Sequence, residues 1–183
     1  MIDDKAAILP LLEYSRPQLQ AWLTERGLPG YRAAQVWRWV FRRRVVDFER
    51  MSDLPQPLRD ELARQWQILT TRVADAQTGS DGTEKLLLSL PDDQQTECVL
   101  LRDDRQHRTV CVSTQVGCAM GCAFCASGLD GLVRNLTRGE ILQQMLHLGR
   151  LLPEQERISN VVVMGMCEPL ANLDELLPAL AVA

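Results

Sequence analysis

Three cysteines lie within eight residues of one another, at Cys118, Cys122 and Cys125, and their spacing suits metal-centred redox chemistry. The C-x₃-C-x₂-C pattern puts three thiolates on one short loop, where they can converge on a soft metal. Four cysteines would close a zinc site or saturate a cubane cluster, whereas three leave one iron of a [4Fe–4S] cluster open. We predict such a cluster here. The alternatives are a zinc site and three unrelated thiols, although zinc usually takes paired C-x₂-C units or histidine.

An open iron has a specific chemical use. It can chelate the amino and carboxylate groups of S-adenosylmethionine and reduce the sulfonium, which releases a 5′-deoxyadenosyl radical. Phe124, directly before the last cysteine, is expected to shield the cluster from water. The sequence therefore predicts two cofactors, a [4Fe–4S] cluster and S-adenosylmethionine.

Several motifs around this loop carry a resemblance to a known family. Besides the cysteine loop they are Arg108–Cys118, Arg134–Thr137, Val161–Leu170, Tyr31–Trp39 and Asp53–Pro55. In these stretches the chain resembles the radical S-adenosylmethionine enzymes, and among them the RlmN/Cfr group, which methylate C2 or C8 of adenine in RNA. The resemblance runs over nearly all of the chain, but the chain stops about halfway through the family architecture.

The resemblance implies roles for four further residues. Cys111 matches a family cysteine that attacks a methylated cysteine in the RNA adduct, and Glu97 matches a glutamate assigned as proton acceptor. Cys167 and Glu168 lie where the family has a Gly-Glu-Pro element that meets the methionine moiety of S-adenosylmethionine. The Glu168 carboxylate suits the ammonium group. Without the family, Cys111 reads as an inward-facing strand residue, Glu97 as a surface carboxylate and Cys167 as a small hydrophobe.

The family route also implies substrates and partners. One S-adenosylmethionine methylates a cysteine, and a second supplies the radical that activates this methyl group for addition to adenine C2. The methyl-carrying cysteine belongs to the C-terminal half of the family barrel, so we expect this chain to be a fragment of an adenine-C2 methyltransferase. Ribosomal RNA, possible transfer RNA substrates and an electron donor such as flavodoxin are the implied partners. The alternative is a non-catalytic iron–sulfur or RNA-binding protein.

Periodicity and turn signals place these motifs on an α/β scaffold. We expect an incomplete radical-enzyme (βα) partial barrel, preceded by a small helical module and an antiparallel β connector. The expected domains are a basic RNA-binding module over 1–70, a β-hairpin connector over 71–106 and the truncated catalytic core over 107–183. The expected helices are 15–27, 31–44, 56–69, 137–152 and 173–181, and the expected strands are 84–90, 96–101, 107–114 and 160–164. Ser15 is the expected N-cap of the first helix, Thr137 and Glu140 form a capping box at the start of the fourth, and Asp81-Gly82 is a hairpin turn. We expect the strand over 107–114 to run straight into the cysteine loop and the strand over 160–164 to be fully buried.

Charge and composition narrow the partners and the compartment. The net charge is −4, yet eight arginines face only three acidic residues between Arg16 and Arg50. Such a block favours phosphate contacts with RNA, although a solvated helix face has the same composition. No apolar run approaches the length needed to span a bilayer, and the first residues are acidic where a secretory signal carries positive charge. Six cysteines around a metal-type motif indicate a reducing cytoplasm.

Overall fold

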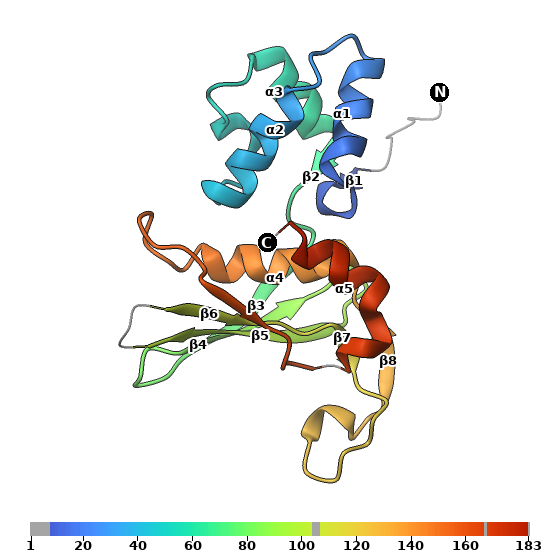
Figure 1. The fold of residues 1–183 in the computed structure, drawn as a ribbon, viewed down its shortest axis with the longest axis vertical. Helices are drawn as coiled ribbons and strands as arrows, with labels where there is room; N and C mark the ends of the chain where they lie inside the picture. Colours follow the sequence, from blue (N-terminus) through green and yellow to red (C-terminus); the bar gives the residue numbers. More distant parts are fainter. Residues whose placement is uncertain (1–7, 104–106, 167, 183) are drawn as a thin grey trace. The chain divides into compact units, whose positions relative to one another are not determined.

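The computed structural model describes residues 8–103, 107–166 and 168–182. The chain separates into two compact units, Met1–Thr70 and Thr71–Ala183. The first is helical, and the second is built on a mixed β-sheet (Figure 1). None of the helices in the described ranges is both long enough and apolar enough to cross a membrane.

Helices and caps build the first unit. Its elements are β1 (Leu9–Pro10), α1 (Arg16–Glu25), α2 (Arg32–Trp37), a π-helical turn (Arg38–Arg42), α3 (Gln56–Gln65) and β2 (Trp66–Gln67). Ser15 caps α1 through a reciprocal capping box with Gln18, and Gly27 follows the helix with φ +70°. The predicted first helix is therefore present. The predicted helix over 31–44 changes from α-helical to π-helical geometry after Trp37.

The third helix is shorter than predicted. It ends at Gln65 because Trp66 and Gln67 instead pair in parallel with Leu9 and Pro10. Trp66 is buried, and its ring meets Tyr14 and Trp22 in edge-to-face contacts with centroids 4.7 and 5.7 Å away. These aromatic contacts favour the extended conformation at Trp66 over a further helical turn.

A five-stranded sheet organises the second unit, in the order β3-β4-β5-β6-β9. The strands are β3 (Arg72–Thr78), β4 (Glu84–Ser89), β5 (Gln95–Arg102), β6 (Arg108–Cys111) and β9 (Asn160–Val162). The first four are antiparallel, and β9 lies parallel to β6. The predicted Asp81-Gly82 hairpin joins β3 to β4, with Gly82 at φ +80°. The strands within 71–106 therefore belong to the same sheet as β6 and β9.

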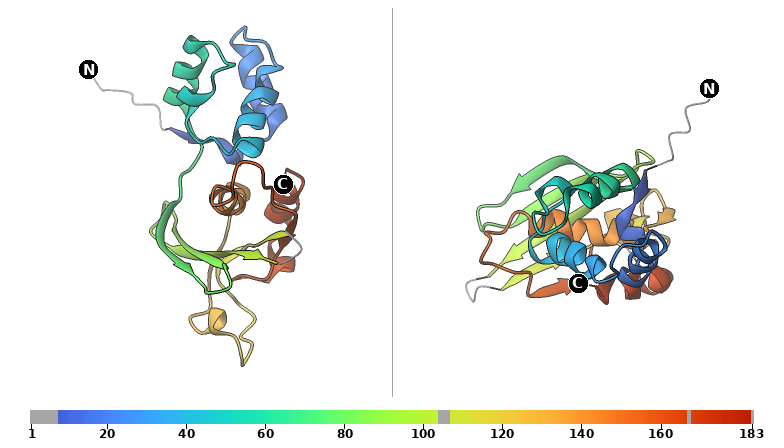
Figure 2. Two further views of the ribbon diagram at one scale, coloured as in Figure 1. Left: turned by 90° about the vertical axis from the view of Figure 1, so that its left-hand side faces the viewer. Right: turned by 90° about the horizontal axis from the view of Figure 1, so that it is seen from above.

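The two faces of this sheet differ in what covers them. Helix α4 (Arg138–Gly149) lies on the concave side of the bent sheet, with α5 (Leu173–Leu180) beside it (Figure 2). The strand residues that face α4 are buried, namely Leu86, Leu88, Thr96, Cys98, Leu100 and Val110. The alternating residues, such as Leu87, Glu97 and Cys111, are half-exposed. One face therefore carries the core, and the other is open.

The second unit begins with hydrogen bonds between Thr71 and helix α4. The Thr71 N–H donates to the Gln143 side chain at 2.8 Å, and the Thr71 hydroxyl lies 3.0 Å from His147 Nε2. Helix α4 starts with the predicted capping box between Thr137 and Glu140, but it ends at Gly149 rather than at Leu152. These hydrogen bonds of Thr71 fix the position at which the chain enters the sheet.

Two predicted strands differ in the structure. Residues 107–114 do not run directly into the cysteine loop, because β6 ends at Cys111 and a separate strand, β7 (Gln115–Gly117), pairs with β8 (Leu132–Asn135). The strand predicted as fully buried over 160–164 is β9. It is half-buried at most, because within the described chain it has β6 as its one hydrogen-bonded neighbour.

Candidate cofactor site

The two ends of the cysteine loop lie close together at the end of β7. Gly117 has φ +73°, and a Cβ atom there would lie 2.0 Å from the Gly131 carbonyl oxygen. The Cys118 N–H donates to that same oxygen at 3.0 Å. Only glycine permits this approach, since the backbone conformation and the space both exclude a side chain. The two ends of the loop are thereby held together.

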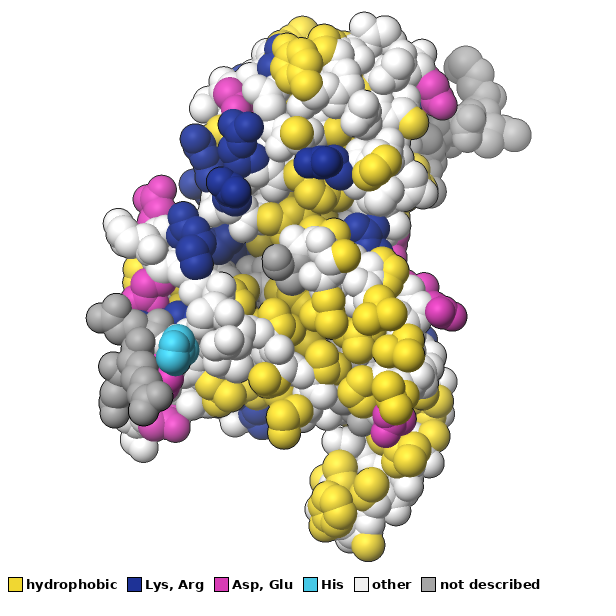
Figure 3. Space-filling view, viewed as in Figure 1, with side chains coloured by type: hydrophobic (Ala, Val, Ile, Leu, Met, Phe, Trp, Pro, Cys, Tyr) yellow, Lys and Arg dark blue, Asp and Glu magenta, His cyan; other side chains and the backbone are white. Residues whose placement is uncertain are grey.

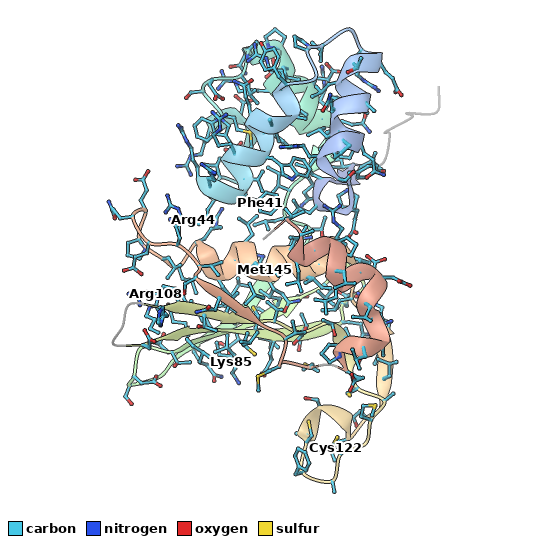
Figure 4. The ribbon with its side chains drawn as sticks, viewed as in Figure 1. Phe41, Arg44, Lys85, Arg108, Cys122 and Met145 are labelled. Atoms are coloured by element: carbon cyan, nitrogen blue, oxygen red, sulfur yellow. The ribbon has the colours of Figure 1, made fainter. Side chains whose placement is uncertain are left out.

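The three candidate ligands lie at different depths in this loop. Cys118 is buried, Cys125 is half-buried, and Cys122 is exposed near the loop tip, which projects from the side of the sheet opposite α4 (Figure 4). A hydrogen bond from the Ser127 side chain to the Cys125 sulfur holds the pKa of that thiol below its ordinary value. Phe124 is 93% exposed, so in this conformation it shields nothing.

The donor set fits an iron–sulfur cluster. Three thiols stand on one short, pinned loop, and one of them is biased toward the thiolate that a metal requires. The loop does not gather the sulfurs into a cage, since no three metal-ligating side chains come together among the residues that the structure describes. The chemistry of the residues therefore matches the predicted cluster, while the observed loop conformation is open.

A second loop follows β9 and is held beside the segment that leaves β6. The Met166 N–H donates to Ser113 Oγ at 2.8 Å, and the Met166 carbonyl accepts from the N–H groups of Thr114 and Gln115. The Glu168 N–H donates to Gln115 Oε1 at 2.8 Å. The backbone is thus held at Met166 and at Glu168 by side chains and amides of 113–115.

Glu168 is the predicted partner for an ammonium group. Its Oε1 accepts the Leu170 N–H at 3.1 Å, so that the carboxylate also caps the short 3₁₀ turn over Pro169–Asn172. Cys167, predicted at the neighbouring cofactor position, lies outside the described residues. The structure thus places Glu168 on the same loop as the clamped Met166.

The other two predicted residues share the open face of the sheet. Val99 pairs with Cys111 across β5 and β6, which makes Glu97 and Cys111 diagonal neighbours on one face. Lys85 on β4 donates to Glu97 Oε1 at 3.1 Å (Figure 4 shows Lys85 on the side of the sheet away from Met145). Both charged side chains are partly exposed, as expected for a surface ion pair.

The two cysteines of the strands, Cys98 and Cys111, differ in burial. Burial raises the pKa of Cys98 to about 12, with smaller contributions from nearby Cys111 and Glu97. Burial also raises the pKa of Cys111, but a backbone hydrogen bond from Met164 opposes the shift. The five described cysteines are all free. Cys98 therefore remains a neutral core thiol.

Sequence reasoning missed the residues that hold the second loop. Ser113 and Gln115 are fully buried, yet both bond to a loop about fifty residues later. A serine and a glutamine after a strand carry no spacing signal of their own. The Lys85–Glu97 pair was missed in the same way, although a lysine twelve residues from a glutamate across a hairpin could have suggested it.

The helical unit carries a separate surface of interest. Arg38, Arg42 and Arg43 are exposed on the π-helical turn and just after it. Figure 3 shows Lys and Arg side chains gathered over this part of the unit. The Arg43 guanidinium lies 4.1 Å from the Trp39 ring centroid, which orients it by a cation–π contact. By contrast, Arg26 pairs with Glu61, and Arg59 bonds within its own unit.

Comparison with known proteins supports the resemblance. Residues 9–68 match the family model "Ribosomal RNA large subunit methyltransferase N-terminal domain". A "probable dual-specificity RNA methyltransferase RlmN" of Rhodopirellula baltica is 54% identical over 94% of this chain and 46% of its own length. A Bacillus cereus relative of the same name is 46% identical over 87% of this chain and 44% of its own.

A solved structure gives the same result. A radical SAM methyltransferase from Sphaerobacter thermophilus matches with a TM-score of 0.88 and 37% identity, over 95% of this chain and 51% of the other. The predicted fold class and the predicted resemblance are thereby confirmed, and the chain spans about half the length of the curated relatives it matches.

Proposed function

We propose that this homologue of the RlmN methyltransferases supplies the RNA-holding module and the cofactor-binding part of a radical S-adenosylmethionine enzyme that methylates adenine C2 in RNA. In this proposal residues 1–70 form the RNA-binding module, 71–106 the β connector and 107–183 the catalytic core. The single observation that carries it is the arrangement at the strand ends. Strand β7 begins at Gln115 and leads after Gly117 into the cysteine loop, and the Glu168 loop is hydrogen-bonded to Gln115.

The cofactor roles follow from the chemistry of the donors. Cys118, Cys122 and Cys125 would hold a [4Fe–4S] cluster, and Glu168, with Cys167 beside it, would receive the methionine moiety of S-adenosylmethionine. When bound, the cluster supplies the electron that cleaves the sulfonium. The carboxylate of Glu168 attracts the ammonium group of the cofactor, a charge-assisted contact that fixes its orientation. A flavodoxin-type protein is the proposed electron donor.

The open face of the sheet would meet the RNA adduct. Cys111 is half-buried beside Val99 and Val162. There its sulfur would attack the sulfur of the thioether that joins a cysteine of the complete enzyme to the methylene group on the base. The S–S bond forms as the S–CH2 bond breaks, and the methylene carbon leaves with the electron pair and takes a proton to become the methyl group. The raised pKa of Cys111 keeps it a thiol until a base acts on it. Glu97, two residues from Val99 on the same face, is the proposed proton acceptor. The ion pair with Lys85, at 3.1 Å, holds this carboxylate on the open face of the sheet.

Ribosomal RNA is the proposed substrate, and transfer RNA is a second one that the words "dual-specificity" in the relatives' names suggest. The exposed arginines of the π-helical turn are suited to phosphates, because phosphate contacts need clustered positive charge. A non-catalytic iron–sulfur or RNA-binding protein would need the cysteine loop or the arginines but neither Cys111 nor Glu97.

The test is a chimaera. This chain should replace the matching half of the Rhodopirellula baltica relative, and the product should be assayed for 2-methyladenosine in ribosomal and transfer RNA by mass spectrometry. Methylation is expected, and Cys118→Ala or Cys111→Ala in the chimaera should abolish it. If the chimaera is inactive with Cys167 but active after Cys167→Gly, then Cys167 obstructs the cofactor. A soluble chimaera that remains inactive with either residue at 167 would contradict the proposed function.

A further inference from the structure

We propose that Ser113 and Gln115 are positioning residues that hold the backbone at Met166 and at Glu168 for the α-amino-acid moiety of a sulfonium cofactor. The inference rests on the proposed function, because it takes Glu168 as the residue that meets this moiety. Neither side chain needs to touch the ligand. Each acts through the backbone of the loop.

Ser113 connects strand β5 to the loop that follows β9. Its hydroxyl accepts the Met166 N–H at 2.8 Å and donates to the Glu97 carbonyl at 2.7 Å. Its own backbone is fixed by α4, since the Gln144 side chain accepts the Ser113 N–H and donates to the Ser113 carbonyl, at 2.8 and 2.9 Å. A hydroxyl held in this way transmits the rigidity of the sheet and of α4 to the loop.

Gln115 holds the same loop two residues further along the chain, at Glu168. Its side chain has no exposed surface, and both ends of its amide are used. Oε1 accepts the Glu168 N–H at 2.8 Å, and Nε2 donates to Asn135 Oδ1 at 2.9 Å. A buried amide without partners is costly, so these bonds constrain the position of the loop as well as that of the side chain.

The space between loop and strand is equally restrictive. A Cβ atom at Gly165 would lie 2.4 Å from Ser113 Oγ and 3.0 Å from the Ser113 nitrogen. The loop therefore packs against Ser113 through a bare backbone. Its peptide groups are held at Met166 and at Glu168, on both sides of position 167. A loop ordered before the ligand arrives loses less conformational entropy on binding.

The experiment compares two ligands that differ only in the amino-acid part. S-Adenosylhomocysteine carries it, and 5′-methylthioadenosine lacks it. Affinities of the 183-residue chain for both should be measured by calorimetry for wild type, Ser113→Ala and Gln115→Leu. The matched control is Ser159→Ala, because the Ser159 hydroxyl also bridges to β6, through Arg108, but at the opposite end of the strand.

Ser113→Ala and Gln115→Leu should each weaken S-adenosylhomocysteine binding about tenfold, the equivalent of one hydrogen bond, and leave methylthioadenosine binding unchanged. The exchange of the Met166 or Glu168 amide hydrogen, measured by NMR, should accelerate in the matching variant. Ser159→Ala should change neither quantity.

Equal weakening of both ligands, or faster exchange without any decrease in affinity, would overturn the positioning role and leave the proposed function intact. Failure of the wild-type chain to bind S-adenosylhomocysteine would instead overturn the cofactor assignment on which both rest. Ser113→Ala removes one oxygen atom and keeps the test informative if Gln115→Leu does not fold.

Discussion

Arg134 holds Glu140 by two parallel hydrogen bonds, from Nη1 to Oε2 at 2.7 Å and from Nη2 to Oε1 at 2.8 Å. Glu140 is buried and also completes the capping box of α4, so this pair joins β8 to the start of the helix. Arg134 Nε donates to Asp92 on the turn after β4 at 2.6 Å. Hydrogen bonds first to Glu140 and then to Asp92 raise the pKa of Arg134, which stays fully charged.

Arg134→Met should therefore destabilise the chain by about 3 kcal/mol, because it leaves the buried Glu140 carboxylate without its counter-charge. Asp92→Asn is the control, since Asp92 is partly exposed and its substitution should cost less than about 1 kcal/mol. Urea unfolding followed by circular dichroism measures both. Equal costs for the two variants would show that Glu140 does not depend on Arg134.

Gly117 and Gly121 offer a matched pair for the base of the cysteine loop. Both have positive φ, at +73° and +58°, but only Gly117 faces a backbone atom within reach of a side chain. Gly121→Ala should cost about 1 kcal/mol, from the left-handed backbone alone. Gly117→Ala should cost about 1–3 kcal/mol more, because its methyl group meets the Gly131 carbonyl. Indistinguishable free energies of unfolding would show that the base of the loop has room for a methyl group.

His147 predicts a pH dependence of stability. Burial, reinforced by Arg150, lowers the pKa of His147 below its ordinary value of 6.5. The unfolded chain therefore binds more protons than the folded chain as the pH falls below about 6.5, and the free energy of unfolding should fall with it. The contribution of His147 to stability is fully present above the pKa that His147 has in the unfolded chain. It is lost as the pH falls toward the lower pKa that His147 has in the folded chain.

The measurement is the urea midpoint between pH 7.5 and pH 5. His147→Gln should flatten the curve in this window, because glutamine can still bond to the Thr71 hydroxyl but does not titrate. A slope unchanged by the substitution would assign the pH dependence to other groups.

Local signals in the sequence predicted much of this fold. Ser15 and Thr137 were recognisable as helix caps, and Asp81-Gly82 as a hairpin turn, because each acts through neighbours within three residues. Strand β3 escaped prediction, since its residues are all exposed and show no alternation of polar and apolar side chains. The end of α3 was wrong because a distant partner strand decides it.

The site residues likewise divide into those marked by a local sequence signal and those decided by distant partners. The three cysteines could be singled out because they lie on one short loop at a spacing typical of metal ligands. Ser113 and Gln115 could not, because their partners lie more than fifty residues away and the bonds go to backbone atoms, which any residue type provides. The open conformation of the cysteine loop was not foreseeable from ligand spacing either.

The proposed RNA-binding role of the helical unit can be tested on the intact chain. Arg42→Glu with Arg43→Glu should weaken RNA binding and make its salt dependence shallower by about one unit of slope for each phosphate that is no longer bound. The control is Arg64→Glu with Arg72→Glu, which makes the same change of charge at exposed arginines that do not belong to the π-helical turn. Equal effects of the two pairs would show attraction to overall charge rather than a binding surface.

Cys118, Cys122 and Cys125 are central to the proposed function, as the ligands of a [4Fe–4S] cluster with one open iron. The most direct measurement is anaerobic reconstitution of the chain with iron and sulfide, followed by optical and electron paramagnetic resonance spectroscopy. We expect a brown protein with an S = 1/2 signal on reduction, which S-adenosylmethionine perturbs. Alanine at any of the three cysteines should abolish the signal, and Cys98→Ala should not. A stable colourless zinc complex on the same three cysteines, with no cluster formed, would contradict this assignment.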